Sequence, residues 1–89
     1  MVTLISGLRE HEIEALTSLC FNIGPDALAG STAIRLLREE DRLGAARAFL
    51  LWRKAGGKVV GHLVRRRHLE AIWFLGAPAE TLHHYASLT

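Results

Sequence analysis

The sequence is short of several features that stabilise many small proteins. Cys20 is the single cysteine among 89 residues, so the chain can form no internal disulfide. A lone thiol in an apolar helical pattern is expected to be a small buried hydrophobe. Only two prolines occur, and aromatic residues make up 7% of the chain. A chain of this size must therefore rely on one modest, mostly aliphatic core.

Long apolar runs are also missing. No uncharged segment approaches the ~20 residues that cross a membrane, so we expect no membrane partner. Residues 1–7 lack the basic start and the long apolar stretch of a signal peptide, which predicts a cytoplasmic protein. Alternation of apolar and polar residues does not persist, and no repeat occurs. These absences argue against sheet folds and repeat folds.

Apolar residues with helical spacing fill most of the chain instead. The spacing predicts helices over residues 8–23, 31–40, 41–52, 59–75 and, more weakly, 79–88, with a short link or single helical turn at 26–30. We therefore predict an all-α fold, a small orthogonal helical bundle. Residues 1–76 are expected to form the domain, and residues 77–89 a helical extension of it.

Capping residues support these boundaries. Ser6, Ser31 and Asp41 each precede a predicted helix and are typical N-caps. Gly24-Pro25 should end the first helix. Gly56-Gly57 is expected to end the helix at 41–52, because glycine adopts the left-handed conformation without strain.

Two tryptophans are the largest core candidates. Trp52 and Trp73 each belong to an apolar helical stripe, so both are predicted to be largely buried. Trp52 has an alternative role, since an exposed tryptophan could stack on a sugar ring. We favour the core position for it.

Basic residues are concentrated in one stretch. Six of them lie between Arg53 and Arg67 with no acid among them, although the formal net charge is only +2. Three consecutive arginines on a helix fan around its axis, so at least one must point toward packed structure or a partner. The stretch could pair with acids of the same domain, could bind nucleic acid or could dock an acidic protein. For the first of these, the candidate acids are Glu70, which could form an intrahelical ion pair, Glu39 and Glu40.

Several short segments occur in an order and at intervals that resemble one known family. They are Phe21-Asn22-Ile23-Gly24, Ser31-Thr32, Ala45-Ala46 with Phe49 and Trp52, Ala55-Gly56-Gly57-Lys58-Val59, and Leu63-Val64-Arg65-Arg66-Arg67 with Glu70. Together they resemble the C-terminal lobe of phage-type lysozymes, the endolysins of glycoside hydrolase family 24. The resemblance covers about residues 8–75 and favours structural pairing of the arginines over nucleic-acid binding.

The resemblance implies a helical lobe that joins a smaller N-terminal lobe, with peptidoglycan bound in the cleft between them. It also implies that the catalytic glutamate lies in the N-terminal lobe, which has no counterpart in this sequence. We therefore expect no catalytic residue here and no activity from this chain alone. The resemblance to phage lysozymes also implies a phage or prophage origin.

The chain's own acids do not suggest an alternative active site. Glycoside hydrolysis normally needs two carboxyl groups across a sugar ring, one of them with a raised pKa. Glu12 and its neighbours are expected in an exposed first turn, and residues 39–41 form a charge run that is usually solvated. A Glu70 paired with arginine would have a lowered pKa, the opposite of what a general acid needs.

Six residues are predicted to contact a substrate or a partner. They are Asn22, Ser31, Thr32, Lys58, Arg65 and Arg66. Asn22 could line the groove or cap the end of its helix, and we weigh these equally; for Ser31 we favour capping.

No metal or cofactor is expected. His83 and His84 are adjacent and do not share a helix face, His62 and His68 are also poorly spaced, and one cysteine is too few for a structural zinc site.

Three functions follow as hypotheses. The first is a catalytically incomplete, endolysin-derived module, regulatory or accessory, which binds a protein partner or peptidoglycan. The second is one half of a split or truncated muramidase. The weakest is a small basic nucleic-acid-binding protein. The face left open by a missing lobe should be covered by self-association, by a partner or by the tail, in which Leu82, Tyr85 and Leu88 could form an apolar strip.

Overall fold

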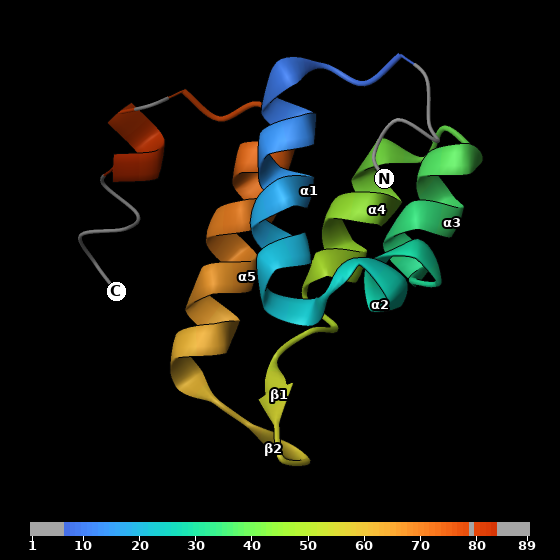
Figure 1. Ribbon diagram of the computed structural model, residues 1–89. Coiled ribbons are helices and arrows are strands. Elements are labelled where there is room, and N and C mark those ends of the chain that lie inside the picture. Colours follow the sequence, from blue (N-terminus) through green and yellow to red (C-terminus); the bar gives the residue numbers. More distant parts are fainter. Residues whose placement is uncertain (1–6, 79, 84–89) are drawn as a thin grey trace.

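The computed structural model describes residues 7–78 and 80–83, which form a small bundle of helices with one β-hairpin (Figure 1). The elements are α1 (Glu10–Ile23), α2 (Pro25–Ala29), α3 (Thr32–Arg38), α4 (Arg42–Phe49), β1 (Lys54–Ala55), β2 (Lys58–Val59) and α5 (Gly61–Phe74). Residues 80–83 are also helical. The predicted small all-α bundle is confirmed, apart from the hairpin. Within the described part, no helix is long and apolar enough to cross a membrane.

The first helix begins later than its predicted cap implies. α1 starts at Glu10, and the backbone N–H of Arg9 at the N-cap donates to Oε1 of Glu12 at 2.8 Å. Ser6 lies outside the described residues. α1 ends as predicted at Gly24, which has a φ of 89°. Pro25 then opens α2, where its missing N–H costs nothing.

The next two helices begin at the predicted caps. The hydroxyl of Ser31 accepts a hydrogen bond from the backbone N–H of Ile34 at 3.2 Å. The carboxylate of Asp41 accepts one from the N–H of Gly44 at 2.9 Å. Each side chain satisfies a backbone donor that the first turn of a helix would otherwise leave without a partner.

Gly56 and Gly57 have a different role from the predicted one. α4 already ends at Phe49, and the two glycines form the turn of an antiparallel hairpin in which Lys54 pairs with Val59. Their φ values of 58° and 80° are both positive, as the central residues of a tight two-residue hairpin turn require. The prediction that they end a helix is therefore wrong, although their left-handed backbone was anticipated.

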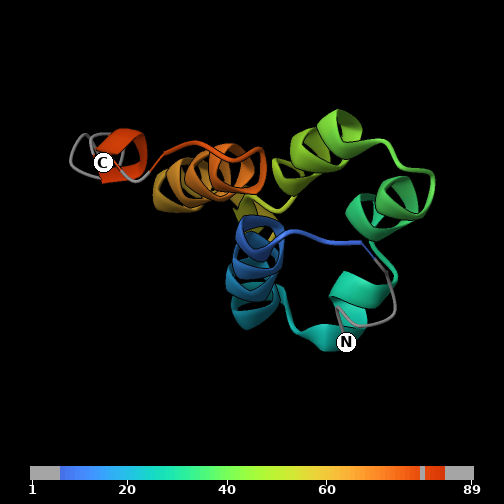
Figure 2. The ribbon, with the colours of Figure 1, turned by 90° about the horizontal axis from the view of Figure 1, so that it is seen from above.

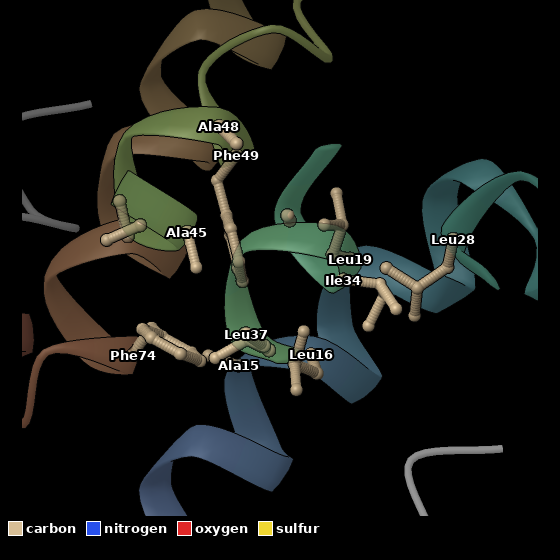
Figure 3. Packing of buried hydrophobic residues seen from close by; sticks show 13 residues of the cluster. Ala15, Leu16, Leu19, Leu28, Ile34, Leu37, Ala45, Ala48, Phe49 and Phe74 are labelled. Carbon is tan, nitrogen blue, oxygen red and sulfur yellow. The ribbon is translucent and has the colours of Figure 1, made fainter. Parts of the chain in front are cut away.

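The core lies where α1 meets the other helices. α1 packs along α5, and α3 packs along α4, so that the helices follow one another around a common centre (Figure 2). Leu16 and Leu19 of α1 are fully buried there, as are Phe49 of α4 and Phe74 of α5 (Figure 3). The two phenylalanine rings have centroids 5.4 Å apart and are tilted by 49°, a favourable aromatic geometry.

The two tryptophans are not the core anchors that the sequence predicts. Trp52 and Trp73 are both half-buried and pack against the edge of the core. Trp52 lies beyond the end of α4, so the helical stripe that places it inside does not extend to it. The fully buried aromatic positions are held by Phe49 and Phe74 instead.

Candidate functional site

A pocket of about 280 Å³ opens where α3 begins. It is lined by Gly30, Ser31, Thr32, Leu51 and Trp52. Thr32 is exposed, Leu51 is 64% exposed and Trp52 is half-buried, so an indole ring, an aliphatic side chain and an exposed threonine line one opening. Ligand pockets commonly combine apolar walls with a few polar groups in this way.

A buried ionic network joins α1 to α5 on another part of the bundle. Nε of Arg67 lies 2.7 Å from Oε1 of Glu70, and both side chains are 1% exposed. The other carboxylate oxygen, Oε2, accepts hydrogen bonds from Ser18 Oγ at 2.5 Å, from Arg66 Nε at 3.2 Å and from Arg67 Nη2 at 3.2 Å. Arg67 Nη2 also donates to Asn22 Oδ1 at 3.1 Å. The network thus fixes one face of α5 to α1.

In this network the buried charges of Arg67 and Glu70 compensate each other. Burial lowers the pKa of the Arg67 guanidinium, and the repulsion by Arg66 acts in the same direction, whereas the charge of Glu70 and its hydrogen bond raise it. A buried charge is tolerated only when it is paired and hydrogen-bonded. Glu70 therefore serves first to compensate Arg67.

A second buried carboxylate lies at the start of α1. Glu12 is 2% exposed, which corrects the prediction that it belongs to an exposed turn. Its Oε2 accepts a hydrogen bond at 2.6 Å from Nε of Arg42, the first residue of α4. The pair lines a pocket of about 360 Å³, whose other lining residues are Gly7, Arg9, His11, Phe74 and Leu75. Burial by itself would raise the pKa of Glu12, but the hydrogen bonds from Arg42 and from the Arg9 backbone, with the charges of Arg42 and His11, lower it overall.

Comparisons with known proteins place the chain in a family. The family model described as phage lysozyme matches residues 1–70 of the chain. The chain belongs to the phage lysozyme family. It is 47% identical over 66 residues to the endolysin of Salmonella phage P22, an alignment that covers 74% of this chain and 45% of that protein. The family resemblance predicted from the sequence is thereby confirmed.

Other phage lysozyme relatives match in the same partial way. The endolysin of Bacillus phage B103 is 36% identical over 78 residues, covering 88% of this chain and 30% of that protein. The endolysin of Acyrthosiphon pisum secondary endosymbiont phage 1 is 37% identical over 76 residues, covering 79% and 51%. The chain thus spans about half or less of the length of these relatives, all of which are phage proteins, in agreement with the expected phage origin.

All nine acidic residues of this phage lysozyme chain lie in the described part of the structure. Only Glu12 and Glu70 are buried, and both are paired with arginine. Each of these two carboxylates accepts a hydrogen bond from an arginine side chain. Groups of three or more histidine, cysteine or acidic side chains that could hold a metal do not occur in this part of the chain.

The predicted contact residues of the lysozyme lobe fall into separate groups. Ser31 and Thr32 line the pocket at α3, although the hydroxyl of Ser31 is engaged as a helix cap. Asn22 does not cap the end of α1; it lies within the last turn, exposed, and accepts the hydrogen bond from Arg67. Arg66 belongs to the same network.

The remaining two predicted residues, Lys58 and Arg65, are exposed on β2 and on the first turns of α5. The structure also adds residues that the sequence analysis missed. Ser18 joins the ionic network through Glu70, and Leu51 forms part of the pocket wall. Ser18 lies four residues before Asn22 on α1, and this polar pair on one helix face was a usable signal.

The Glu12–Arg42 pair gives the fold a defined acid sensitivity. The pKa of Glu12 is lowered in the folded chain from the ordinary glutamate value of 4.5, which applies to the unfolded chain. The pair therefore stabilises the fold above that pH, and the contribution is lost as the pH falls through the lowered folded pKa. We expect the Glu12→Gln variant to be less stable at pH 7 and to lose less stability than the parent between pH 5 and pH 3. Urea unfolding at several pH values measures this, and parallel pH profiles for the two proteins would contradict it.

Proposed function

We propose that this chain is a peptidoglycan-binding lobe of the phage lysozyme type, which holds a glycan strand and does not cleave it by itself. The observation that carries the proposal is the pocket at α3, where the exposed Thr32 and Leu51 and the half-buried Trp52 share one opening. A sugar ring presents an apolar face and a rim of hydroxyl groups. An indole ring beside a hydroxyl side chain offers partners for both parts of such a ligand.

The absence of a catalytic role in the proposal follows from the carboxylates. Hydrolysis of a glycosidic bond normally uses a protonated carboxylic acid together with a second carboxylate. Glu12 and Glu70 are each paired with a buried or half-exposed arginine, and the other acids of the chain are exposed. We therefore expect the purified chain to leave a suspension of cell walls turbid. Clearing at a rate comparable to that of a complete endolysin, abolished by one glutamate substitution, would contradict this.

Binding is tested by blocking the pocket without changing the core. In the Thr32→Arg variant a long side chain at an exposed position fills the opening, and we expect retention on insoluble peptidoglycan to weaken about tenfold, or ~1.4 kcal/mol. Sedimentation of the protein with purified peptidoglycan is the measurement. Thr17→Arg is the matched control, because Thr17 is also exposed but lies on α1, outside the pocket. Equal retention of both variants would remove the pocket from the binding site.

A second candidate is one half of a muramidase whose other lobe supplies the catalytic carboxylates. The coverage supports it, since this chain aligns with 45% of the endolysin of Salmonella phage P22. Mixing this chain with the remaining, unmatched part of that endolysin should then restore lysis. If the mixture stays inactive while the chain alone binds peptidoglycan, the binding function stands without the split enzyme.

A further inference from the structure

The hairpin and the start of α5 carry exposed cations that have no carboxylate partner among the described residues. We call them the hairpin cations: Arg53, Lys54, Lys58 and Arg65. Within the described residues, the ion pairs are formed by other arginines, which lie on α3, on α4 and further along α5. Between positions 53 and 69 the sequence contains no acid at all. The positive charge here is therefore not neutralised by the fold itself.

The hairpin and the start of α5 place these cations on one short projecting segment of the chain. β1 and β2 project from the helices (Figure 1), and their register pairs Lys54 with Val59 and Lys58 with Ala55, so that the two lysines lie on opposite faces of the hairpin. The N–H of Val60 donates to the carbonyl of Arg53 at 3.0 Å, which fixes the hairpin to the N-terminus of α5. Exposed like charges on one short segment repel one another, and a flexible anionic polymer that contacts both faces of the hairpin lowers that repulsion.

We propose that the hairpin cations bind a phosphodiester polymer attached to the peptidoglycan, of the wall teichoic acid type. The inference rests on the proposed function, because such a polymer is joined to the glycan strand that the pocket would hold. The two surfaces are neighbours along the chain, since Arg53 directly follows Trp52 of the pocket wall. Flexible lysine and arginine side chains bind a chain of phosphates without requiring a rigid shape, and the release of counterions drives the association.

The composition of the surface favours such a polymer over nucleic acid. Residues 53–69 include no asparagine, glutamine, serine or threonine and no phenylalanine, tyrosine or tryptophan. The amide side chains that read adenine edges and the large aromatic rings that most often stack on bases are therefore missing from it, and its polar side chains besides lysine and arginine are the imidazoles of His62 and His68. What remains is a group of positive charges suited to a phosphate backbone without bases.

The experiment compares two forms of one cell-wall preparation. Gram-positive walls are isolated with their phosphodiester polymer, and a portion is stripped of it by hydrofluoric acid. The test variant is the triple substitution Lys54→Gln, Lys58→Gln and Arg65→Gln. The control is the triple substitution Arg35→Gln, Arg38→Gln and Arg47→Gln, which removes equal charge from exposed residues of α3 and α4. Thermal melting first establishes that each variant is folded. If the triple test variant is not folded, the double variant Lys54→Gln and Lys58→Gln takes its place.

In sedimentation at about 50 mM salt, we expect the parent to bind the intact walls roughly tenfold more tightly than the stripped ones. The test variant should lose this gain and keep its binding to stripped walls, while the control variant keeps both. The slope of log affinity against log salt should become shallower by about 2 in the test variant.

Equal affinity of the parent for both wall preparations would overturn the inference, as would an equal loss in the two triple variants. A duplex DNA competitor that displaces the protein from intact walls at a lower phosphate concentration than soluble glycerol phosphate polymer would also overturn it, in favour of nucleic acid. Failure of the parent to bind stripped walls, with binding to intact walls retained, would instead contradict the proposed glycan site alone.

Discussion

Replacing Glu70 by alanine is expected to remove a large part of the stability of this protein. The change leaves Arg67, which is 1% exposed, as a buried charge without its carboxylate partner. Breaking one side of a buried ion pair typically costs about 3–5 kcal/mol. A domain of this size has a total free energy of unfolding of only about 5–10 kcal/mol. Urea unfolding followed by circular dichroism should therefore show a much lower midpoint, with partial unfolding in the absence of urea.

Two further variants separate the ion pair from general packing. The double variant Arg67→Met and Glu70→Leu removes both charges together and should recover much of the lost stability, since an apolar pair needs no charge compensation. Glu39→Ala breaks the exposed Arg35–Glu39 pair and should change stability by no more than about 0.5 kcal/mol. An unchanged midpoint for Glu70→Ala would show that Arg67 finds another partner or solvent.

The local part of this network could be predicted from the sequence. Glu70 lies three and four residues after Arg67 and Arg66, and this spacing alone places the side chains on one helix face. The Ser18–Glu70 contact joins residues 52 positions apart, so no local spacing indicates it. For the same reason the burial of Glu12 was missed, because its partner Arg42 lies 30 positions away on another helix.

The helices were predicted more accurately than what joins them. Caps such as Ser31 and Asp41 act within one turn of their own helix, so the sequence carries their full signal. The hairpin has strands of only two residues, too short for an alternating pattern to appear. Gly56-Gly57 suits a helix end and a tight hairpin turn equally well, since both use a positive φ. Only the end of α4 at Phe49 decides between them.

The position of Trp52 follows from that same helix end. Once the chain leaves α4, helical spacing no longer determines which way a side chain points. Trp52 therefore lies half-buried at the pocket. Its replacement by alanine should lower the free energy of unfolding by less than the loss typical of a buried tryptophan, which is about 3–5 kcal/mol. The pocket itself brings together residues about 20 positions apart, which the sequence could not place side by side.

Phe49→Ala is expected to have an effect as large as the loss of Glu70, for a different reason. Phe49 is fully buried in α4, and its ring packs against Phe74 where α4 meets α5. Removing a buried phenylalanine ring typically costs about 3–5 kcal/mol, as lost burial and as the cavity that remains. For a domain of this size the melting temperature should fall by at least about 12 °C.

Phe21 supplies the matched control for this experiment, because it is 86% exposed near the end of α1. Phe21→Ala removes the same atoms from water rather than from the core, and alanine is the better helix former. Its melting temperature should stay within the range that about ±0.5 kcal/mol produces. A large loss for Phe21→Ala would show that its ring is covered in solution, by a second copy or by another segment of the chain. Equal small losses for both variants would instead contradict the position of Phe49 in the core, since only a ring that packs against Phe74 leaves a cavity when it is removed.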